Sequence, residues 1–444
     1  MKTETGSLRG RVDWALIVAW GGLLALGTVA ILSAASPMPR YPQIMQRHFL
    51  AMGVGTLLFF IALGFNYQVY QDQAKVIYGA VLALLVIVLA VGHTQRGAQR
   101  WIRLPFFTFQ PVELARVLMT LVLAAYLDRR APRSGTVGLV VGGFALTLPV
   151  LALVIAQPDF SSALTFFPML VGMLYCAGAS VAPLGALAAY GVITLGLPML
   201  WTLIMLHPGW SSASGLVDGF MRLREWSGLG VALIVVAAGA WLAWRVSLQL
   251  RASLPPVYFG MAALILAAGL VSGVAADHML KDYQRDRFVA FLLPEADPHG
   301  ASYNVAQAQI AIGSGGLWGK GIFAGTQSRL GFLPERHTDF IFAAIGEEMG
   351  FFGAMAVLGF YLLLLWRIVD TARQARDRFG FLVCCGLGSI LSFHLLVNVG
   401  MCVGLVPVAG IPLPLVSYGG SDLAMTLFAL GIVANIYSRR YAFY

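Results

Sequence analysis

Repeated apolar segments, each long enough to cross a lipid bilayer as a helix, dominate this sequence of 444 residues. Hydrophobic residues make up 59% of the chain and charged residues only 11%, whereas a soluble protein of this size carries roughly 25% charged residues. A chain with this pattern must satisfy its backbone hydrogen bonds within each apolar segment. We therefore expect an all-α, polytopic membrane protein.

About twelve segments of roughly 20 residues fit the hydropathy. Their predicted ranges are 14–35, 49–66, 76–92, 112–127, 136–156, 161–178, 183–206, 229–247, 256–276, 339–366, 380–404 and 421–437. An even number of spans places both termini on one side. The short loops of that side are rich in arginine, so the positive-inside rule predicts cytoplasmic termini. The polar N-terminus does not resemble a cleavable signal peptide.

The unusual polar motifs all fall on the opposite side of the predicted membrane, which suggests one composite site. Many cations accompany them, and the whole chain has a formal net charge of +9. These cations have two readings from sequence: solvated loop charges, or a cluster around an anionic headgroup. We see no internal repeat of the inverted kind found in transporters.

Asp339 is the first candidate for chemistry, because it lies where the polar loop Leu333–Thr338 turns into an apolar helix. An acid at the mouth of a membrane helix is costly unless it is hydrated, paired or used. It is a candidate general base. The alternative is a helix-terminal acid favoured by the helix dipole, with Thr338 as the N-cap. His337 either tunes Asp339 or is an ordinary loop residue.

Other acids on this side are more typical of structural support. Glu347 and Glu348 lie deeper in the same helix and are expected to hydrogen-bond to neighbouring elements. Glu113 and Arg116 are three residues apart, so they can pair on one helix face. Asp159 follows a proline between two spans and is expected to cap the next helix, with a cavity-facing role as the alternative.

Two further motifs have a simple structural interpretation. Gly313, Gly315 and Gly316 do not form a nucleotide-binding P-loop, because no Gly-Lys-Ser/Thr follows, and a flexible turn is expected. Trp101 either stacks on a sugar or belongs to the interfacial aromatic belt. The four cysteines and seven histidines show no disulfide framework or metal-ligand spacing.

Several motifs occur together in an order that is characteristic of one family. They are Gly97-Ala98-Gln99-Arg100-Trp101, Gln110-Pro111-Val112-Glu113, Gln157-Pro158-Asp159, Asp297-Pro298 with Gly300, Ile312–Leu317, Gly319-Lys320-Gly321, Gly325-Thr326-Gln327, Leu333–Phe342, Asn398–Met401, Gly410–Pro414 and Ser417–Ser421. With them the chain resembles the SEDS (shape, elongation, division and sporulation) family over nearly its whole length. The segment from Gly325 to Glu335 is most similar to the RodA members.

The resemblance implies a core of ten transmembrane helices and a peptidoglycan glycosyltransferase that polymerises lipid II during cell elongation and shape maintenance. Asp339 would correspond to the essential acid, which deprotonates the acceptor 4-hydroxyl so that undecaprenyl pyrophosphate is released. The implied donor-binding cations are Arg47, Arg100, Arg285 and Arg287. Further candidate substrate-binding residues are Trp101, Lys320, Glu335, His337 and Ser417.

The resemblance also implies partners and a location. The substrates would be lipid II and the growing glycan strand at the outer face of the bacterial cytoplasmic membrane, and the partner a class B penicillin-binding protein, with no nucleic acid. No cofactor is certain; Mg²⁺ or Mn²⁺ is left open, with Asp297 and Asp159 as candidate ligands. The alternatives are an FtsW-like division or sporulation polymerase, a lipid II flippase, and a non-catalytic scaffold.

Three features depart from the family pattern. Val112 and Arg116 stand where serine and lysine are usual, and Asp422 stands where a small polar residue is common. The third is a two-helix insertion at about 207–276. We expect residues 1–444 to form a single transmembrane domain, with a large extracytoplasmic loop at 277–338.

Overall fold

The computed structural model describes residues 12–95, 98–103, 108–130, 136–207, 209–210, 215–250, 255–293 and 300–441. Helices dominate this part of the chain, and ten of those described are long and apolar enough to cross a membrane. The chain is therefore a multi-pass, all-α membrane protein, as its hydropathy predicts. Two other predicted spans also form helices but are not among these ten. Pro111–Arg130 carries several charges, and Phe160–Cys176 has only 17 residues.

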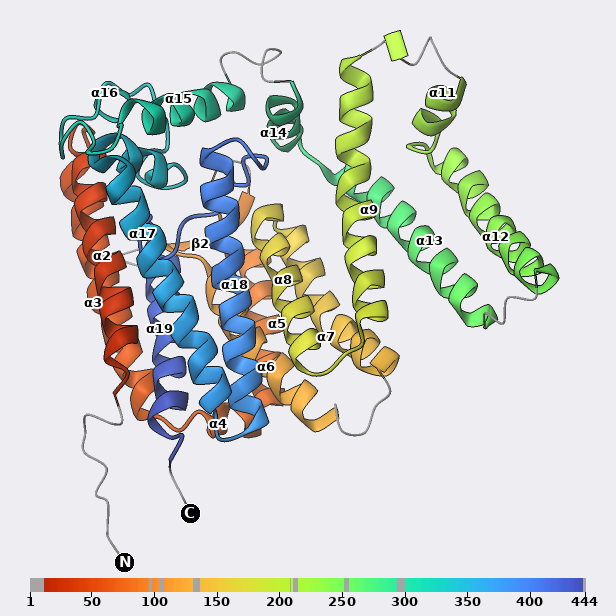
Figure 1. Ribbon diagram of the computed structural model, residues 1–444, viewed down its shortest axis with the longest axis horizontal. Helices are drawn as coiled ribbons and strands as arrows, with labels where there is room; N and C mark the ends of the chain where they lie inside the picture. Colours follow the sequence, from red (N-terminus) through yellow and green to blue (C-terminus); the bar gives the residue numbers. More distant parts are fainter. Residues whose placement is uncertain are drawn as a thin grey trace, which may run out of the picture. The chain divides into compact units, whose positions relative to one another are not determined.

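The described helices fall into a long and a short group (Figure 1). The long helices are α2 (Trp14–Ala35), α3 (Tyr41–Gly64), α5 (Ala74–Val91), α6 (Pro111–Arg130), α7 (Thr136–Ala156), α8 (Phe160–Cys176), α9 (Val181–Leu206), α12 (Trp226–Gln249), α13 (Pro256–Met279), α17 (Ile341–Gln374), α18 (Arg378–Cys402) and α19 (Gly420–Ser438). The short helices are α4 (Gln68–Asp72), α11 (Gly215–Arg222), α14 (Asp282–Leu292), α15 (Ala301–Ser314) and α16 (Thr326–Arg329).

The chain divides into two compact units. The first comprises Met1–Ala179 and Asn304–Tyr444, and the second comprises Ser180–Tyr303. The two helices predicted within 207–276 are α12 and α13 of the second unit. The predicted loop 277–338 contains the short helices α14, α15 and α16 and contributes to both units.

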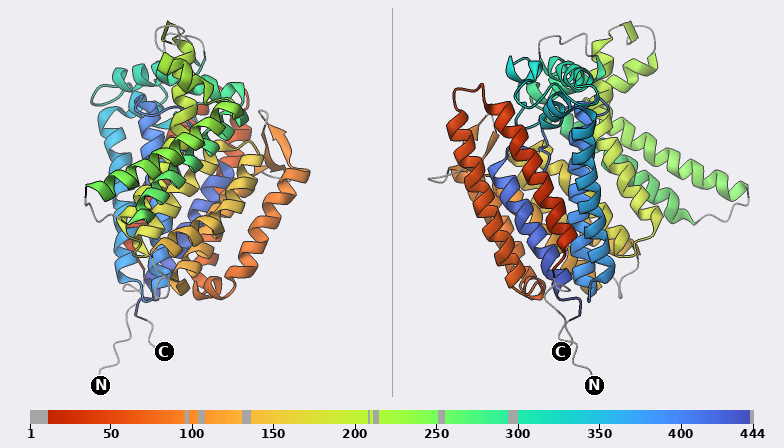
Figure 2. Two further views of the ribbon diagram at one scale, coloured as in Figure 1. Left: turned by 90° about the vertical axis from the view of Figure 1, so that its right-hand side faces the viewer. Right: turned by 60° about the vertical axis from the view of Figure 1, so that its left-hand side comes forward.

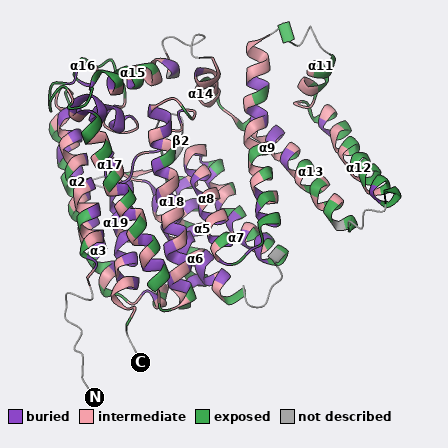
Figure 3. Ribbon diagram, viewed as in Figure 1, coloured by how far each residue is buried: buried purple, intermediate pink, exposed green. Residues whose placement is uncertain are grey.

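Helix α19 lies at the centre of the first unit, where it packs along α3 (Figures 1 and 2). Its apolar stretch is more deeply buried than that of any other candidate span among the described residues (Figure 3). Close approach depends on Gly431, because a Cβ there would lie 2.5 Å from the Phe59 carbonyl oxygen. Helices α15 and α16 lie at one end of this unit and α4 at the other (Figure 1).

A small antiparallel sheet between α5 and α6 was not predicted from the sequence. It consists of β1 (His93–Gln95), β2 (Ala98–Arg103) and β3 (Thr108–Phe109), in the order β1-β2-β3. The strands are too short to produce a clear hydropathy alternation, which is why the segment reads as a loop. The sheet determines where Arg100 and Trp101 are held.

Helix α17 is broken at Gly350, whose φ is +66°. The glycine-rich segment before it packs into the break: the Lys320 and Gly321 amides donate to the Glu347 and Glu348 carbonyls, and the Phe351 amide donates to Gly316. A Cβ on Gly319 would lie 2.2 Å from the Glu348 carbonyl oxygen. Of the three glycines predicted as a flexible turn, Gly313 instead lies within α15, whereas Gly315 and Gly316 lie in a turn. A Cβ on Gly315 would lie 1.9 Å from the Gly346 carbonyl oxygen, so this turn also permits close backbone packing.

The second unit has a small core of its own. Leu197 and Trp201 of α9 pack with Leu229 of α12 and Val274 of α13, and the Trp201 indole donates to the Phe220 carbonyl at 3.1 Å. Elsewhere α12 is mostly exposed and apolar (Figure 3). An apolar helix with so little protein contact is suited to a lipid environment.

Candidate active site

Asp339 lies in a series of turns that immediately precedes α17. The helix begins at Ile341 rather than at residue 339, and its N-cap residue is Phe340. Thr338 is not the cap, which corrects the alternative reading of the sequence: its hydroxyl instead donates to the carbonyl and carboxylate oxygens of Glu335, both at 3.2 Å. Asp339 is partly exposed at the end of these turns.

Three consecutive carbonyl groups hold the Asp339 backbone. The His337 carbonyl accepts from the Tyr418 amide at 2.8 Å. The Thr338 carbonyl accepts from the Ser417 hydroxyl at 2.7 Å, and the Asp339 carbonyl accepts from the Asn398 side chain at 3.0 Å. The backbone around the acid is thus fixed from α18 and from the segment before α19.

Ser417 is enclosed within this arrangement. Its side chain is buried, and besides donating to Thr338 it accepts from the Leu413 amide at 2.9 Å. The sequence predicts Ser417 as a substrate-binding residue. Its position instead favours a role in joining two protein segments.

Tyr418 brings cationic and aromatic side chains together beside Asp339. Its ring centroid lies 5.5 Å from that of His337 and 6.5 Å from that of His48. The Arg47 guanidinium hydrogen-bonds to the phenol, and Arg47 itself is exposed on the first turns of α3. Burial raises the pKa of Tyr418, while the nearby Arg47 charge opposes this rise.

Arg336, in contrast, is directed into the protein. Its side chain is buried, and its Nε donates to the Ala34 carbonyl at 2.8 Å. This burial lowers the pKa of Arg336 below its ordinary value. Arg336 therefore joins the turns before α17 to the end of α2.

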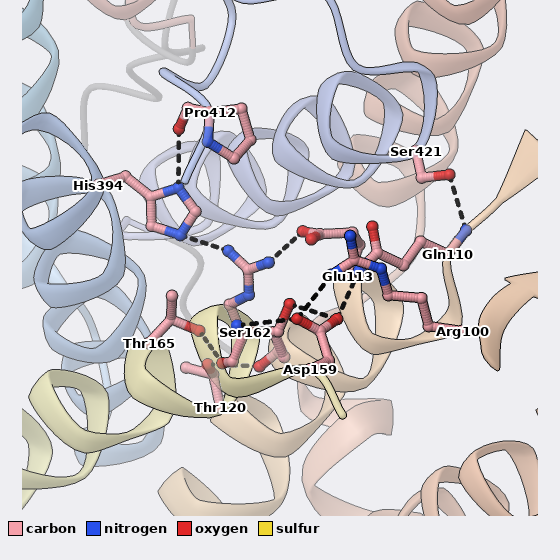
Figure 4. A network of polar contacts seen from close by, with 11 residues as sticks. Arg100, Gln110, Glu113, Thr120, Asp159, Ser162, Thr165, His394, Pro412 and Ser421 are labelled. Atoms are coloured by element: carbon pink, nitrogen blue, oxygen red, sulfur yellow. Dashed lines mark hydrogen bonds and ion pairs between the residues drawn. The ribbon is translucent and has the colours of Figure 1, made fainter. Parts of the chain in front are cut away.

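A second group of polar residues centres on Asp159 (Figure 4). Asp159 caps α8, as the sequence predicts, by accepting from the Ser162 amide. Its carboxylate also accepts from Arg100 at 2.9 Å, Gln110 at 2.8 Å and the Ser162 hydroxyl at 2.8 Å. Arg100 is a predicted substrate-binding cation, yet here a buried acid already pairs with it. The same guanidinium lies 5.9 Å from the Trp101 ring centroid.

Glu113 and Arg116 form the predicted ion pair inside the protein. Arg116 also contacts His394 of α18, whose other ring nitrogen lies 3.3 Å from the Pro412 carbonyl (Figure 4). These side chains and Asp422 line a cavity of about 30 Å³. That space suits a water molecule rather than a sugar, which favours a structural role for this group.

Glu347 and Glu348 lie in the first part of α17, and both are buried. Glu347 accepts from Lys320, Thr326 and the amides of Gln327 and Ser328 at 2.8–3.0 Å. Glu348 accepts from Ser33 of α2 at 2.7 Å. Both acids thus make the hydrogen bonds to neighbouring elements that the sequence predicts, and Lys320, a predicted substrate-binding residue, pairs with Glu347.

Arg285 and Arg287 belong to α14 of the second unit. Arg285 shares the buried Asp277 with Arg224, at 3.2 and 2.6 Å respectively. Arg287 is partly exposed.

The structure describes only part of the predicted metal site. Asp297 lies outside the described residues, and Asp159 has the protein partners given above. Within the described ranges, no group of three or more His, Cys, Asp or Glu side chains is arranged to hold a metal ion.

The sequence analysis missed the structural importance of Asn398 and His394. They are four residues apart in the largely apolar α18, so they lie on one face of it. Both reach backbone oxygens in the segment Ile411–Pro412. Two polar residues at helical spacing in a membrane helix are the signal that could have identified them.

Comparison with known proteins gives a consistent match. The profile of the FtsW, RodA and SpoVE family, described as "Cell cycle protein", matches residues 11–217 and 226–442. The peptidoglycan glycosyltransferase MrdB of Escherichia coli K12 is 34% identical, over 94% of this chain and 92% of the relative. The peptidoglycan glycosyltransferase RodA of Treponema pallidum is 31% identical, over 96% and 98%.

Solved structures agree with these relatives. The rod shape determining protein RodA of Thermus thermophilus has a TM-score of 0.58 and 27% identity, covering 97% of this chain and 98% of its own. A chain described under "Structural coordination of polymerization and crosslinking by a peptidoglycan synthase complex" has a TM-score of 0.61 and 29% identity, covering 97% and 98%.

Proposed function

Because the chain belongs to the FtsW, RodA and SpoVE family of cell cycle proteins, we propose that it is a peptidoglycan glycosyltransferase that polymerises lipid II. Support comes from relatives named for this activity that align over more than nine-tenths of the chain. The match to RodA members favours a role in elongation and cell shape over division or sporulation.

Asp339 is the general base of this reaction. Its carboxylate takes the proton of the acceptor sugar's 4-hydroxyl while that oxygen attacks the donor's anomeric carbon. The new glycosidic bond forms as the bond to the pyrophosphate oxygen breaks, and undecaprenyl pyrophosphate leaves. The observation that carries this assignment is the anchoring of three successive carbonyls at residues 337–339, which presents a partly exposed carboxylate from a fixed backbone. Such preorganisation favours proton transfer.

Arg47 is the best-supported donor-binding cation in the first unit. It is exposed and lies beside Tyr418, which contacts His337 near Asp339. A guanidinium there would stabilise the negative charge that develops on the leaving pyrophosphate. Arg100 and Lys320 already pair with Asp159 and Glu347. Each cation would therefore have to contact the substrate and its carboxylate partner at the same time. Arg285 and Arg287 of the second unit remain proposed donor-binding cations, and Trp101, Glu335 and His337 remain candidates for the sugars.

The proposal includes a location and partners. The chain lies in the bacterial cytoplasmic membrane. Both of its termini lie in the cytoplasm, because arginines concentrate in the short loops on the same side as the termini. The site then faces outwards, where lipid II and the glycan strand meet it. A class B penicillin-binding protein is the proposed partner, supported by similarity to a chain from a peptidoglycan synthase complex. Mg²⁺ or Mn²⁺ assistance is tested by adding a chelator to the assay below.

Polymerisation of labelled lipid II by the purified full-length protein tests this function. Glycan polymer should form, and Asp339→Asn, which keeps the side-chain shape but removes the base, should abolish it. The matched control is Asp370→Asn, which removes an acid that pairs with Arg367 at 2.7 Å further along α17 and should leave polymerisation intact. Polymer from Asp339→Asn at the unsubstituted rate would refute the base assignment, transport of lipid II without polymer would indicate a flippase, and neither activity would indicate a scaffold.

A further inference from the structure

Asn398 occupies a fully buried position in α18. Its side-chain Nδ2 donates to two carbonyl oxygens, that of Asp339 at 3.0 Å and that of Ile411 at 2.9 Å. One amide group therefore joins the residue proposed as general base to the segment Ile411–Ser417, which packs beside it.

The chemistry of its two neighbours fixes the orientation of this amide. Both are backbone carbonyls, which can only accept hydrogen bonds, so the amide must direct its NH₂ group towards them. Its Oδ1 is buried and has no hydrogen-bond partner among the described residues. A buried unpaired oxygen costs folding free energy, so greater stability alone is a poor explanation for an asparagine here.

The segment that Asn398 joins to Asp339 is itself well anchored. The Tyr361 hydroxyl of α17 donates to the Pro414 carbonyl, and His394 of α18 contacts the Pro412 carbonyl. Within the segment, the Ser417 hydroxyl accepts from the Leu413 amide. Asn398 thus joins the Asp339 backbone to a segment that α17 and α18 also hold through other side chains. Of the three residues that hold carbonyls 337–339, it is the one that bonds to Asp339 itself.

We propose that Asn398 is a positioning residue that holds the Asp339 carboxylate at the distance and angle required for proton transfer. This inference rests on the proposed function. A misplacement of about 1 Å at a reacting group can reduce the rate roughly 100-fold, so the loss of this contact should slow the chemical step more than it weakens substrate binding.

The variant Asn398→Leu tests the proposal, because leucine has a similar size and neither donates nor accepts hydrogen bonds. Its matched control is Asn435→Leu. Asn435 is also buried, and its side chain donates to the Leu63 carbonyl and accepts from the Tyr67 amide near α4. Both substitutions remove backbone contacts of a buried amide, but only the first touches Asp339.

The full-length variants are compared by lipid II polymerisation and by thermal unfolding in the same detergent. We expect Asn398→Leu to lower kcat by about 10- to 100-fold with KM changed by less than about 2-fold, while Asn435→Leu keeps the unsubstituted kcat in its folded fraction. A normal kcat for folded Asn398→Leu would overturn the proposal, as would equal losses of kcat in the two variants. If Asn398→Leu fails to fold, Asn398→Ala, which removes both hydrogen bonds without adding bulk, replaces it, and a normal kcat there would also overturn the proposal. Failure of the proposed function would appear separately, as an unsubstituted protein that forms no polymer, and failure of the base assignment as an Asp339→Asn variant that polymerises at the unsubstituted rate.

Discussion

The Ser417 hydroxyl donates a 2.7 Å hydrogen bond to the carbonyl oxygen of Thr338, the residue that precedes Asp339. The two residues are 79 positions apart in the sequence, and one lies before α17 while the other lies before α19. The site is therefore a junction of two irregular segments held at the ends of membrane helices. Irregular backbone of this kind is tolerated at a membrane only where protein or a hydrated cavity satisfies it.

Ser417→Ala should destabilise this junction and slow polymerisation. The substitution leaves the Thr338 carbonyl and the Leu413 amide without their partner, which costs about 1–3 kcal/mol of unfolding free energy. We expect kcat to fall about 10-fold with little change in KM, measured by lipid II titration and thermal unfolding.

Ser389→Ala is the control for this variant, because the Ser389 hydroxyl donates to the Cys385 carbonyl within α18 and does not bond to the segments around Asp339 that the structure describes. A raised KM for Ser417→Ala with normal stability would instead support the substrate-binding role that the sequence suggests.

The sequence predicts much of the helical framework, because membrane helices follow from hydropathy within a short window. It is less accurate where polar residues continue a helix: α3 begins at Tyr41 instead of residue 49, which places Arg47 on the helix rather than before it. The roles of Asn398 and Ser417 depend on partners 59 and 79 residues away. Local spacing contains no information about such contacts, so sequence places the acid but not what holds it.

Glu347→Gln should weaken the docking of the segment Lys320–Ser328 onto α17. Glu347 accepts from one lysine, two hydroxyls and two amides. A glutamine would direct an NH₂ group at several of these donors and leave Lys320 without its carboxylate. We expect a loss of about 2–4 kcal/mol in unfolding free energy, measured by equilibrium unfolding in detergent.

Asp370→Asn serves as the comparison, because its partner Arg367 retains a second carboxylate in Asp13. A loss for Glu347→Gln no larger than that for Asp370→Asn would contradict the supporting role of Glu347.

Gly350→Ala should disrupt the break in α17. The residue has a φ of +66°, and a Cβ there would lie 2.2 Å from the Gly319 amide nitrogen. Backbone strain in this region, which essentially only glycine adopts, and overlap with backbone atoms each cost on the order of 1–3 kcal/mol. We therefore expect a combined loss of about 3 kcal/mol and a proportionate fall in the folded yield. Thermal unfolding measures the loss.

Gly359→Ala on the same helix is a matched control, because a Cβ there meets no atom within 4 Å. It should be neutral or slightly stabilising, since alanine favours helix more than glycine. Equal unfolding midpoints for the two variants would show that the break tolerates a side chain.

Arg116 and Asp422, which both depart from the family pattern, should be energetically coupled. Both line the cavity beside Glu113, and the Asp422 carboxyl hydrogen-bonds to the Glu113 carboxyl. Lysine keeps the charge of Arg116, but its single ammonium cannot reproduce the planar fork that contacts both Glu113 and His394. Arg116→Lys alone should therefore cost about 1–2 kcal/mol of unfolding free energy.

Adding Asp422→Ser removes the second acid, and we expect it to recover at least about 0.5 kcal/mol in a double-mutant cycle of unfolding free energies. The control cycle combines Arg116→Lys with Asp13→Asn, since Asp13 bonds to Arg367 and the Leu16 amide and shares neither partner with Arg116. That cycle should be additive, and additivity in both cycles would mean that Arg116 and Asp422 are energetically independent.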